Sequence, residues 1–360
     1  MVVAMRKNKP IIMKLDPYMF SEKEREILAS PSFCVSLFRY RTGVEALRIK
    51  IGRGEFIWLP YLGQQLWDWS IDGKSLKFEG FIEEPSYGKN FLQNYGGFLI
   101  HCGMTAMGNP GPEDTHLHHG ELPVAKFDEA WIEMEPENGS ESPVSLCGHI
   151  HWKVPFVAEY HCSPSLNISA DGLQASMEVL LNNPASKTME YMYLAHINFA
   201  FSGAEKILST VPFDSSHVTI RADGEEKTAA LFADPSLIKQ IDKKAKYEPE
   251  LVAILNHRDI ASEAGSILLY EDGTARWVRQ QKPELDHHVI WITHNEDRGA
   301  CGFHLPSTAG PTGYSNEKNL GNLKHLPAGC NATLRYDFGF ADRLEDVPII
   351  CTKSRLSNVG

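Results

Sequence analysis

The chain has 360 residues, of which 42% are hydrophobic and 22% charged, and its formal net charge is −11 at pH 7. These values are ordinary for a globular protein with a sizeable core, and an acidic balance without a basic stripe excludes a nucleic-acid partner. No apolar run approaches the length of a membrane span, so we expect no membrane association.

The first residues lack a long apolar segment and a small-residue cleavage site, so we expect no secretory signal. The seven cysteines are scattered along the chain without a CxxC spacing. Such an odd, dispersed set is typical of reduced and mostly buried thiols. We therefore expect a cytoplasmic protein.

In chain order, residues 20 to 30 predict a short N-terminal helix, with Ser21 as its N-cap and Glu24 three residues later. Helical character returns only briefly at 235–246. Elsewhere, runs rich in β-branched and aromatic residues end in Gly or Asp-Gly turn signals, as strands of hairpins do. These runs cover 35–43, 45–54, 55–63, 64–73, 127–135, 145–155, 156–172, 173–183, 189–202, 217–224, 267–273, 274–280, 287–295, 300–308 and 332–340.

Strand signals this frequent, without long alternating helices, exclude a doubly wound parallel sheet and favour a large antiparallel sandwich or barrel. No fixed-period repeat and no linker is visible. We therefore predict an all-β fold with a short N-terminal helix. The expected organisation is an extension over 1–35, one β-sandwich domain over 36–345 and a C-terminal tail over 346–360.

The most informative stretch is 94–121, in which an apolar run leads into a loop rich in Gly and Pro. The loop carries His116, His118 and His119, followed by Gly120 and Glu121. Loops held by a rigid scaffold are where functional residues concentrate. Few structural needs place three imidazoles and a carboxylate within six residues, so this loop is a candidate site.

Two later strand-like segments also carry polar groups where packing needs none. His196 and Asn198 share one face of a strand by its period of two. His304 lies in the run 302–308, which leads into a loop rich in Gly and Pro. Because all three segments lie near strand ends, they favour one shared site.

The order of His119-Gly120, His196-x-Asn198-Phe199 and the late strand from Gly302 resembles the aldose 1-epimerase, or galactose mutarotase-like, superfamily. The resemblance is closest to the epimerase-like DUF4432 family, whose "CG…G.P…HG", "H-x-N-F" and "G-x-E-P-[AS]-[TS]" stretches each have a counterpart here. It covers roughly residues 40 to 340 and implies a β-supersandwich with a sugar-binding cleft.

In mutarotases a glutamate takes the proton of the anomeric hydroxyl while a histidine protonates the ring oxygen, which is general acid–base catalysis. By position, the resemblance implies that His196 is the ring-oxygen acid and that His119 binds and polarises the sugar. His304 is expected where the family has its glutamate base. Either His304 is the base, or Glu121 has taken over that role, or the protein no longer runs this reaction.

The same residues suggest a rival chemistry. His119, His196 and His304, together with Glu121 or His118, would form a metal site with open positions for Zn, Mn or Fe. A bound divalent cation would support sugar isomerisation or epimerisation instead of anomer exchange. A further pair, His149-x-His151, is expected to face the surface.

Sugar-binding side chains are also expected outside these segments. Aromatic rings can stack on the apolar faces of sugars, and the candidates are Trp67, Trp69, Trp131, Trp152 and Trp291. Amide and carboxylate groups that could bind hydroxyls are Gln64, Gln65, Asp68 and Asn198, and Arg221 or Arg258 could bind an acidic sugar. The alternative is core packing for the tryptophans, an ordinary polar strand face for Gln64, Gln65 and Asp68, and exposed ion pairing for the arginines.

We therefore expect an enzyme that interconverts anomers of a free sugar or sugar acid without a cofactor. In this scheme His119, His196, His304 and Glu121 are catalytic, and Asn198, Gln65, Asp68, Trp131 and Arg258 bind substrate. The alternatives are a metal-dependent sugar isomerase or epimerase and a non-catalytic sugar-binding module. The sequence does not decide the sugar or the oligomeric state.

Overall fold

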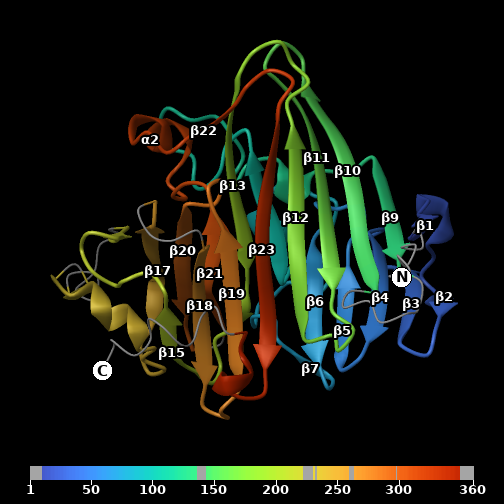
Figure 1. Ribbon diagram of the computed structural model, residues 1–360, viewed down its shortest axis with the longest axis horizontal. Helices are drawn as coiled ribbons and strands as arrows, with labels where there is room; N and C mark the ends of the chain where they lie inside the picture. Colours follow the sequence, from blue (N-terminus) through green and yellow to red (C-terminus); the bar gives the residue numbers. More distant parts are fainter. Residues whose placement is uncertain are drawn as a thin grey trace, which may run out of the picture.

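In the computed structural model, the described residues are 10–135, 143–221, 230–231, 233–258, 263–296 and 298–348. They form two antiparallel sheets that pack face to face (Figure 1). The predicted all-β sandwich is therefore confirmed. None of the helices in these ranges is long and apolar enough to cross a membrane.

The first sheet has nine strands in the described residues, and its edge strands are β1 and β15. In spatial order they are β1 (Ile11–Lys14), β9 (Glu129–Met134), β10 (Val144–Val154), β11 (Ala158–Ile168), β12 (Gln174–Asn182), β23 (Asn331–Ala341), β19 (Ala275–Gln281), β18 (Glu263–Tyr270) and β15 (Ala204–Ser209).

The second sheet has fourteen strands in the same ranges. Its main path is β16 (Val218–Ile220), β17 (Tyr247–Asn256), β20 (His287–His294), β21 (Gly299–Ser307), β13 (Met189–Ile197), β8 (Leu99–Met104), β6 (Leu66–Ile71), β5 (Gly54–Trp58), β4 (Glu45–Ile51), β3 (Phe33–Arg39) and β2 (Arg25–Ala29). Beside this path, β14 (Phe199–Ala200) pairs with β21, β22 (Lys324–Leu326) with β13, and β7 (Lys74–Ser75) with β6.

Little of the described chain is helical. The α-helix α2 spans Tyr314–Asn319, and single 3-10 turns lie at η1 (Pro17–Met19), η2 (Leu92–Asn94), η3 (Leu122–Val124), η4 (Pro235–Lys239) and η5 (Leu344–Asp346). The helical character expected over 235–246 is thus limited to the turn η4 and does not continue to residue 246.

The helix predicted over 20–30 is wrong, because Arg25–Ala29 form the edge strand β2. Pairing with β3 overrides the helical propensity, as tertiary contacts often do. Ser21 does not cap a helix, and its hydroxyl donates to the carbonyl of Lys23. The expected N-terminal extension therefore supplies β2 to one sheet and β1 to the other. Residues 349–360 of the expected tail lie outside the described ranges.

The core lies between the two sheets, and aromatic rings from both meet there. Trp69 of β6 lies 5.6 Å, centroid to centroid, from Phe338 of β23 and 5.6 Å from Phe98 before β8. Strands of the first sheet alternate between buried and partly exposed residues, as β11 does. In contrast, every residue of β8 and β21 is buried, because their outer face is also covered.

Candidate functional site

The histidine-rich loop leaves β8 and folds back onto it. Glu121 fixes this return, since its carboxylate accepts hydrogen bonds from the amides of Met104 (3.0 Å) and Thr105 (2.9 Å). It also accepts from the hydroxyls of Thr105 (2.7 Å) and Tyr160 (2.8 Å). Burial raises the pKa of this carboxyl. The Glu121 side chain is thereby committed to the loop and does not line the cavity described below.

The turn that presents His119 needs an unusual backbone. His119 has φ +59° and Gly120 has φ +81°. A Cβ on Gly120 would lie 2.2 Å from the carbonyl oxygen of Ala106, so only glycine fits there. The amide of His119 donates to Gly108, and its carbonyl accepts from Gly103. The loop thus holds His119 rigidly against the outer face of the fourteen-stranded sheet.

A cavity of about 270 Å³ lies at this place and brings together four strands and four connecting segments. Its strand residues come from β13, β17, β20 and β21. The lining residues are Phe91, Leu92, Tyr95, Asn109, His118, His119, Leu194, His196, Arg221, Glu250, Val252, Val289, Trp291, Leu305 and Pro311. We refer to it as the histidine cavity.

The imidazoles of the cavity are closely packed and desolvated. The His118 and His119 ring centroids are 4.6 Å apart, and those of His119 and His196 are 5.5 Å apart. Burial lowers the pKa of His196 to about 4 and that of His119 well below its ordinary value. These rings are neutral at pH 7 and can accept or donate hydrogen bonds in a defined tautomer.

Hydrogen bonds behind the cavity orient His196. Its Nδ1 lies 3.2 Å from the Tyr95 hydroxyl, which donates to Oδ1 of Asn198 over 2.6 Å. Asn198 is fully buried and does not line the cavity. Asn198 is therefore not placed to bind substrate directly, as the sequence predicted. It contacts Tyr95, which does line the cavity.

The carboxylate of the cavity is Glu250 of β17, which the sequence analysis did not identify. Its Oε1 accepts from Nη2 of Arg221 over 2.6 Å, and its Oε2 accepts from Nε1 of Trp291 over 2.8 Å. Glu250 and Val252 are two residues apart and both line the cavity. That alternation was the available signal, but a single glutamate in an apolar strand resembles an ordinary exposed residue.

His304 lies on the opposite face of the sheet. Its Nδ1 is 2.8 Å from the Ser266 hydroxyl, and its Nε2 is 2.9 Å from Oε1 of Gln280. Its ring stacks on that of His288 at 4.0 Å. Since β18 and β19 supply Ser266 and Gln280, His304 is enclosed between the sheets. The expectation that three histidines line one hollow is therefore wrong for His304.

A β-bulge explains why Leu305, and not His304, faces the cavity. The β20–β21 register runs from Val289↔Leu305 to Trp291↔Gly302, so β21 contains one extra residue. A Cβ on Gly302 would lie 2.9 Å from Cδ2 of Leu305, which places both on one side.

The ligand set expected for a metal is therefore not assembled. His119 and His196 meet in the histidine cavity, whereas Glu121 and His304 lie elsewhere. Within residues 10–348, apart from the undescribed gaps, no group of three or more His, Cys, Asp or Glu side chains is arranged to hold a metal ion.

Apart from Arg221 and Trp291, which line the cavity, the remaining candidates for sugar binding lie away from it. Gln65 is buried and donates to the carbonyl of Pro123, while Asp68 accepts from Ser75. Trp131 on β9 donates to Glu133, and Arg258 pairs with Asp286 over 2.9 Å. Local hydrogen bonds engage Gln65, Asp68 and Trp131, and an ion pair engages Arg258. Of the five tryptophan candidates, Trp291 alone lines the cavity.

The pair His149 and His151 lies on β10 of the nine-stranded sheet, away from the cavity. Their rings stack with that of His161 on β11, at 5.2 Å and 3.9 Å between centroids. Both residues are partly exposed, as expected from the sequence.

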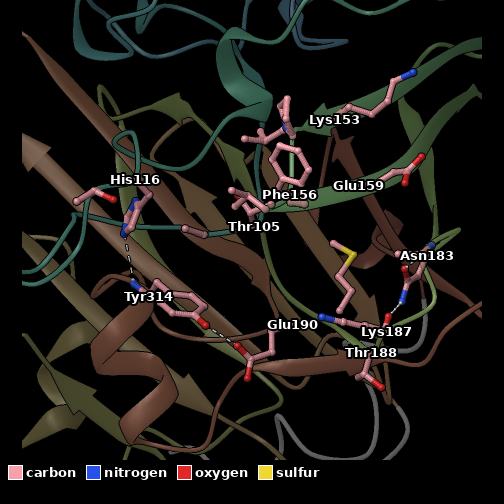
Figure 2. A pocket seen from close by; sticks show the side chains of 18 of the residues that line it. Thr105, His116, Lys153, Phe156, Glu159, Asn183, Lys187, Thr188, Glu190 and Tyr314 are labelled. Atoms are coloured by element: carbon pink, nitrogen blue, oxygen red, sulfur yellow. Dashed lines mark hydrogen bonds between the residues drawn. The ribbon is translucent and has the colours of Figure 1, made fainter.

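A second cavity, of about 930 Å³, opens beside the turn between β10 and β11, and its walls include Phe156, Tyr314 and Glu190 (Figure 2). Two of its acidic groups are already engaged. Glu190 accepts from the Tyr314 hydroxyl and pairs with Lys318, and Asp114 accepts from Ser315. This cavity is larger, but the desolvated imidazoles that could do acid–base chemistry lie in the histidine cavity.

No protein-family model and no curated protein matches the chain. Solved structures do match its fold. A proposed aldose 1-epimerase from Klebsiella pneumoniae superposes with a TM-score of 0.74 at 14% identity, over 92% of this chain and 87% of that one. A galactose mutarotase-like protein from Clostridium acetobutylicum gives 0.57 at 13% identity, over 87% and 99%. These likenesses show a galactose mutarotase-like fold.

Proposed function

We propose that the protein is a carbohydrate-active enzyme that opens and closes the ring of a free sugar in the histidine cavity and so interconverts its anomers. The observation that carries this proposal is the meeting of His119, His196 and Glu250 in one ligand-sized hollow. Burial lowers the pKa of both histidines, and histidines with perturbed pKa values in a cleft are typical of active sites. The mutarotase-like fold adds support by analogy.

The size and lining of the cavity suit one sugar ring. Its volume of about 270 Å³ is near the lower end of ordinary ligand pockets, which start at about 300 Å³. Trp291 and Phe91 supply aromatic surface, and Leu194, Val289 and Leu305 supply aliphatic surface. Sugars present apolar C–H faces that pack on such surfaces, while the polar groups of the lining bind hydroxyls.

The reaction requires that the anomeric hydroxyl lose a proton, that the bond from C1 to the ring oxygen break, and that the ring oxygen gain a proton. The neutral imidazoles of the cavity, His196 among them, and the carboxylate of Glu250 carry lone pairs that can accept a proton. His304 and Glu121 have no direct part in this scheme, since they do not reach the cavity.

The test is the rate of anomer interconversion for freshly dissolved single anomers of neutral aldoses and uronic acids, followed by NMR. Acceleration above the spontaneous rate, lost in His196→Gln, is the expected result. If no sugar is accelerated but one binds tightly, the protein is a sugar-binding module and the enzymatic proposal is wrong.

A metal-dependent isomerase would have to use ligands other than the set named from the sequence. Metal analysis of protein purified without chelator, combined with an assay for conversion of aldoses to ketoses, tests this alternative. Stoichiometric metal together with ketose formation would favour it over anomer exchange.

A further inference from the structure

We propose that Asn198 and Tyr95 form a hydrogen-bond chain that holds His196 as the tautomer protonated at Nδ1, so that its bare Nε2 is the proton acceptor of the cavity. Tyr95 and Asn198 are then positioning residues, and His196 is the catalytic base. The catalytic part of this inference rests on the proposed function. The assignment of the tautomer rests on hydrogen-bond geometry alone.

The chain starts from the amide of Asn198, whose orientation is determined by the backbone. Its Nδ2 lies 2.9 Å from the carbonyl oxygen of Gly97. A carbonyl oxygen can only accept, so the NH₂ group must be on that side. Oδ1 of Asn198 therefore faces Tyr95, where it can only accept.

The Tyr95 hydroxyl in turn determines which ring nitrogen of His196 is protonated. The Tyr95 hydroxyl has one proton and donates it to Oδ1 of Asn198 over 2.6 Å. Its oxygen can then only accept from the other neighbour, Nδ1 of His196, at 3.2 Å. Nδ1 must carry the proton of the neutral ring. Nε2 is left with a lone pair and is the nitrogen available to a ligand in the cavity.

The surroundings keep His196 in this state until substrate arrives. Its side chain is buried and its pKa is lowered to about 4, so the ring is neutral at pH 7. The ring also packs edge-on against Trp291, with 5.1 Å between centroids. Glu250 is near enough to raise the pKa of His196 through its negative charge, so it stabilises the imidazolium that forms in the reaction.

His119 provides the complementary donor. Its Nδ1 is buried and has no partner among the described residues. Because a buried N–H without an acceptor is rarer than an unfilled acceptor, the ring proton belongs on Nε2. The cavity therefore contains an imidazole acceptor, His196, and an imidazole donor, His119, with 5.5 Å between ring centroids.

These tautomers define a balanced step. Nε2 of His196 takes the proton of the anomeric hydroxyl, the O1–C1 bond becomes a double bond, and the bond from C1 to the ring oxygen breaks. Nε2–H of His119 donates a hydrogen bond to the negative charge that develops on the ring oxygen. The imidazolium of His196 then returns its proton to that oxygen. The product of this step is the open-chain sugar, and His196 is again a neutral imidazole.

The tautomer can be observed directly in the full-length protein labelled with ¹⁵N-histidine. Long-range ¹H–¹⁵N NMR at pH 7.5 distinguishes a protonated from a bare ring nitrogen, and His196→Gln identifies the signals. We expect a protonated Nδ1 and a bare Nε2 in the wild type. In Tyr95→Phe, Nδ1 loses its acceptor, so we expect a shift toward the Nε2–H tautomer and a fall in kcat of about tenfold to hundredfold, with KM changed less.

The matched control is Tyr270→Phe. It removes a different buried phenol hydroxyl, one that donates to the backbone carbonyl of Ala200. It should leave the His196 signals and kcat unchanged. A wild-type His196 protonated at Nε2, or a Tyr95→Phe variant with an unchanged His196 tautomer, would overturn the inference. Absence of turnover with every sugar would instead contradict the proposed function, while the NMR result would still decide the tautomer.

Discussion

At the residue scale, two histidines of neighbouring strands have opposite fates. His196 of β13 lines the histidine cavity, whereas His304 of β21 is enclosed by Ser266, Gln280 and His288. Both are neutral because burial lowers their pKa. Only His196 can contact a ligand. We therefore expect substitution of His196 to affect catalysis and substitution of His304 to affect stability.

Replacing His196 by Gln should lower kcat for anomer interconversion by about 10²–10⁴-fold, the range of general acid–base catalysis, with little change in thermal unfolding. Replacing His304 by Gln should instead lower the free energy of unfolding by about 1–3 kcal/mol, because its buried hydrogen bonds are lost, and leave kcat of the folded protein unchanged. Steady-state kinetics and urea unfolding measure both. Equal losses of kcat would show that His304 acts on the reaction.

Glu250 is the second functional residue at this scale. In Glu250→Gln, the charge that stabilises imidazolium at His196 is removed, and the amide cannot accept from both Arg221 and Trp291. We expect kcat/KM to fall by about tenfold to hundredfold, or about 1.4–2.7 kcal/mol of transition-state stabilisation. The control is Glu178→Gln, which breaks an exposed pair with Arg335 on the nine-stranded sheet. A similar fall in both variants would contradict a specific role for Glu250.

At the element scale, the loop after β8 depends on Glu121. Four hydrogen bonds converge on its buried carboxylate. Because His119 and Gly120 immediately precede this anchor in the chain, the position of the His119 ring depends on it.

Replacing Glu121 by Ala should lower the free energy of unfolding by about 2–4 kcal/mol, since buried donors lose their acceptor. Glu121→Gln, which keeps one acceptor oxygen, should cost less. Urea unfolding measures both changes. If Glu121→Ala abolished turnover without loss of stability, the carboxylate would have a catalytic role and our placement of it would be wrong.

At the scale of the whole molecule, the fold buries many imidazoles in the neutral form. Burial lowers the pKa of His101 to about 3 and of His257 to about 4, and it lowers those of His288 and His304 well below their ordinary value. The unfolded chain binds protons at these histidines near pH 6.5, but the folded chain does not. Stability is therefore complete above pH 6.5 and is lost as the pH falls toward the folded pKa values.

Each such histidine costs about 1.4 kcal/mol per pH unit below pH 6.5, so several acting together should destabilise the protein by several kcal/mol at pH 5.5. Urea unfolding at pH 7.5 and pH 5.5 measures this loss. Equal free energies of unfolding at the two pH values would contradict neutral burial of these side chains.

Local patterns in the chain were sufficient for the fold class and for part of the site. Alternating apolar residues and Asp-Gly or Gly turns specify antiparallel hairpins, because side chains of a strand alternate between its faces. The loop with His119 and the strand with His196 could be identified from residue types alone, since apolar packing at these positions does not require imidazole side chains. The helix expected over 20–30 failed because an edge strand is stabilised by its neighbour β3, which lies outside the local window.

The distribution of the remaining site residues required the folded chain. A one-residue bulge in β21 places Leu305 toward the cavity and His304 toward the core, and no local pattern reveals a bulge. Glu250, Arg221 and Trp291 meet only because β16, β17 and β20 are neighbours in the sheet. Strand order depends on contacts between segments far apart in the chain, so the chemistry of the cavity follows from tertiary packing.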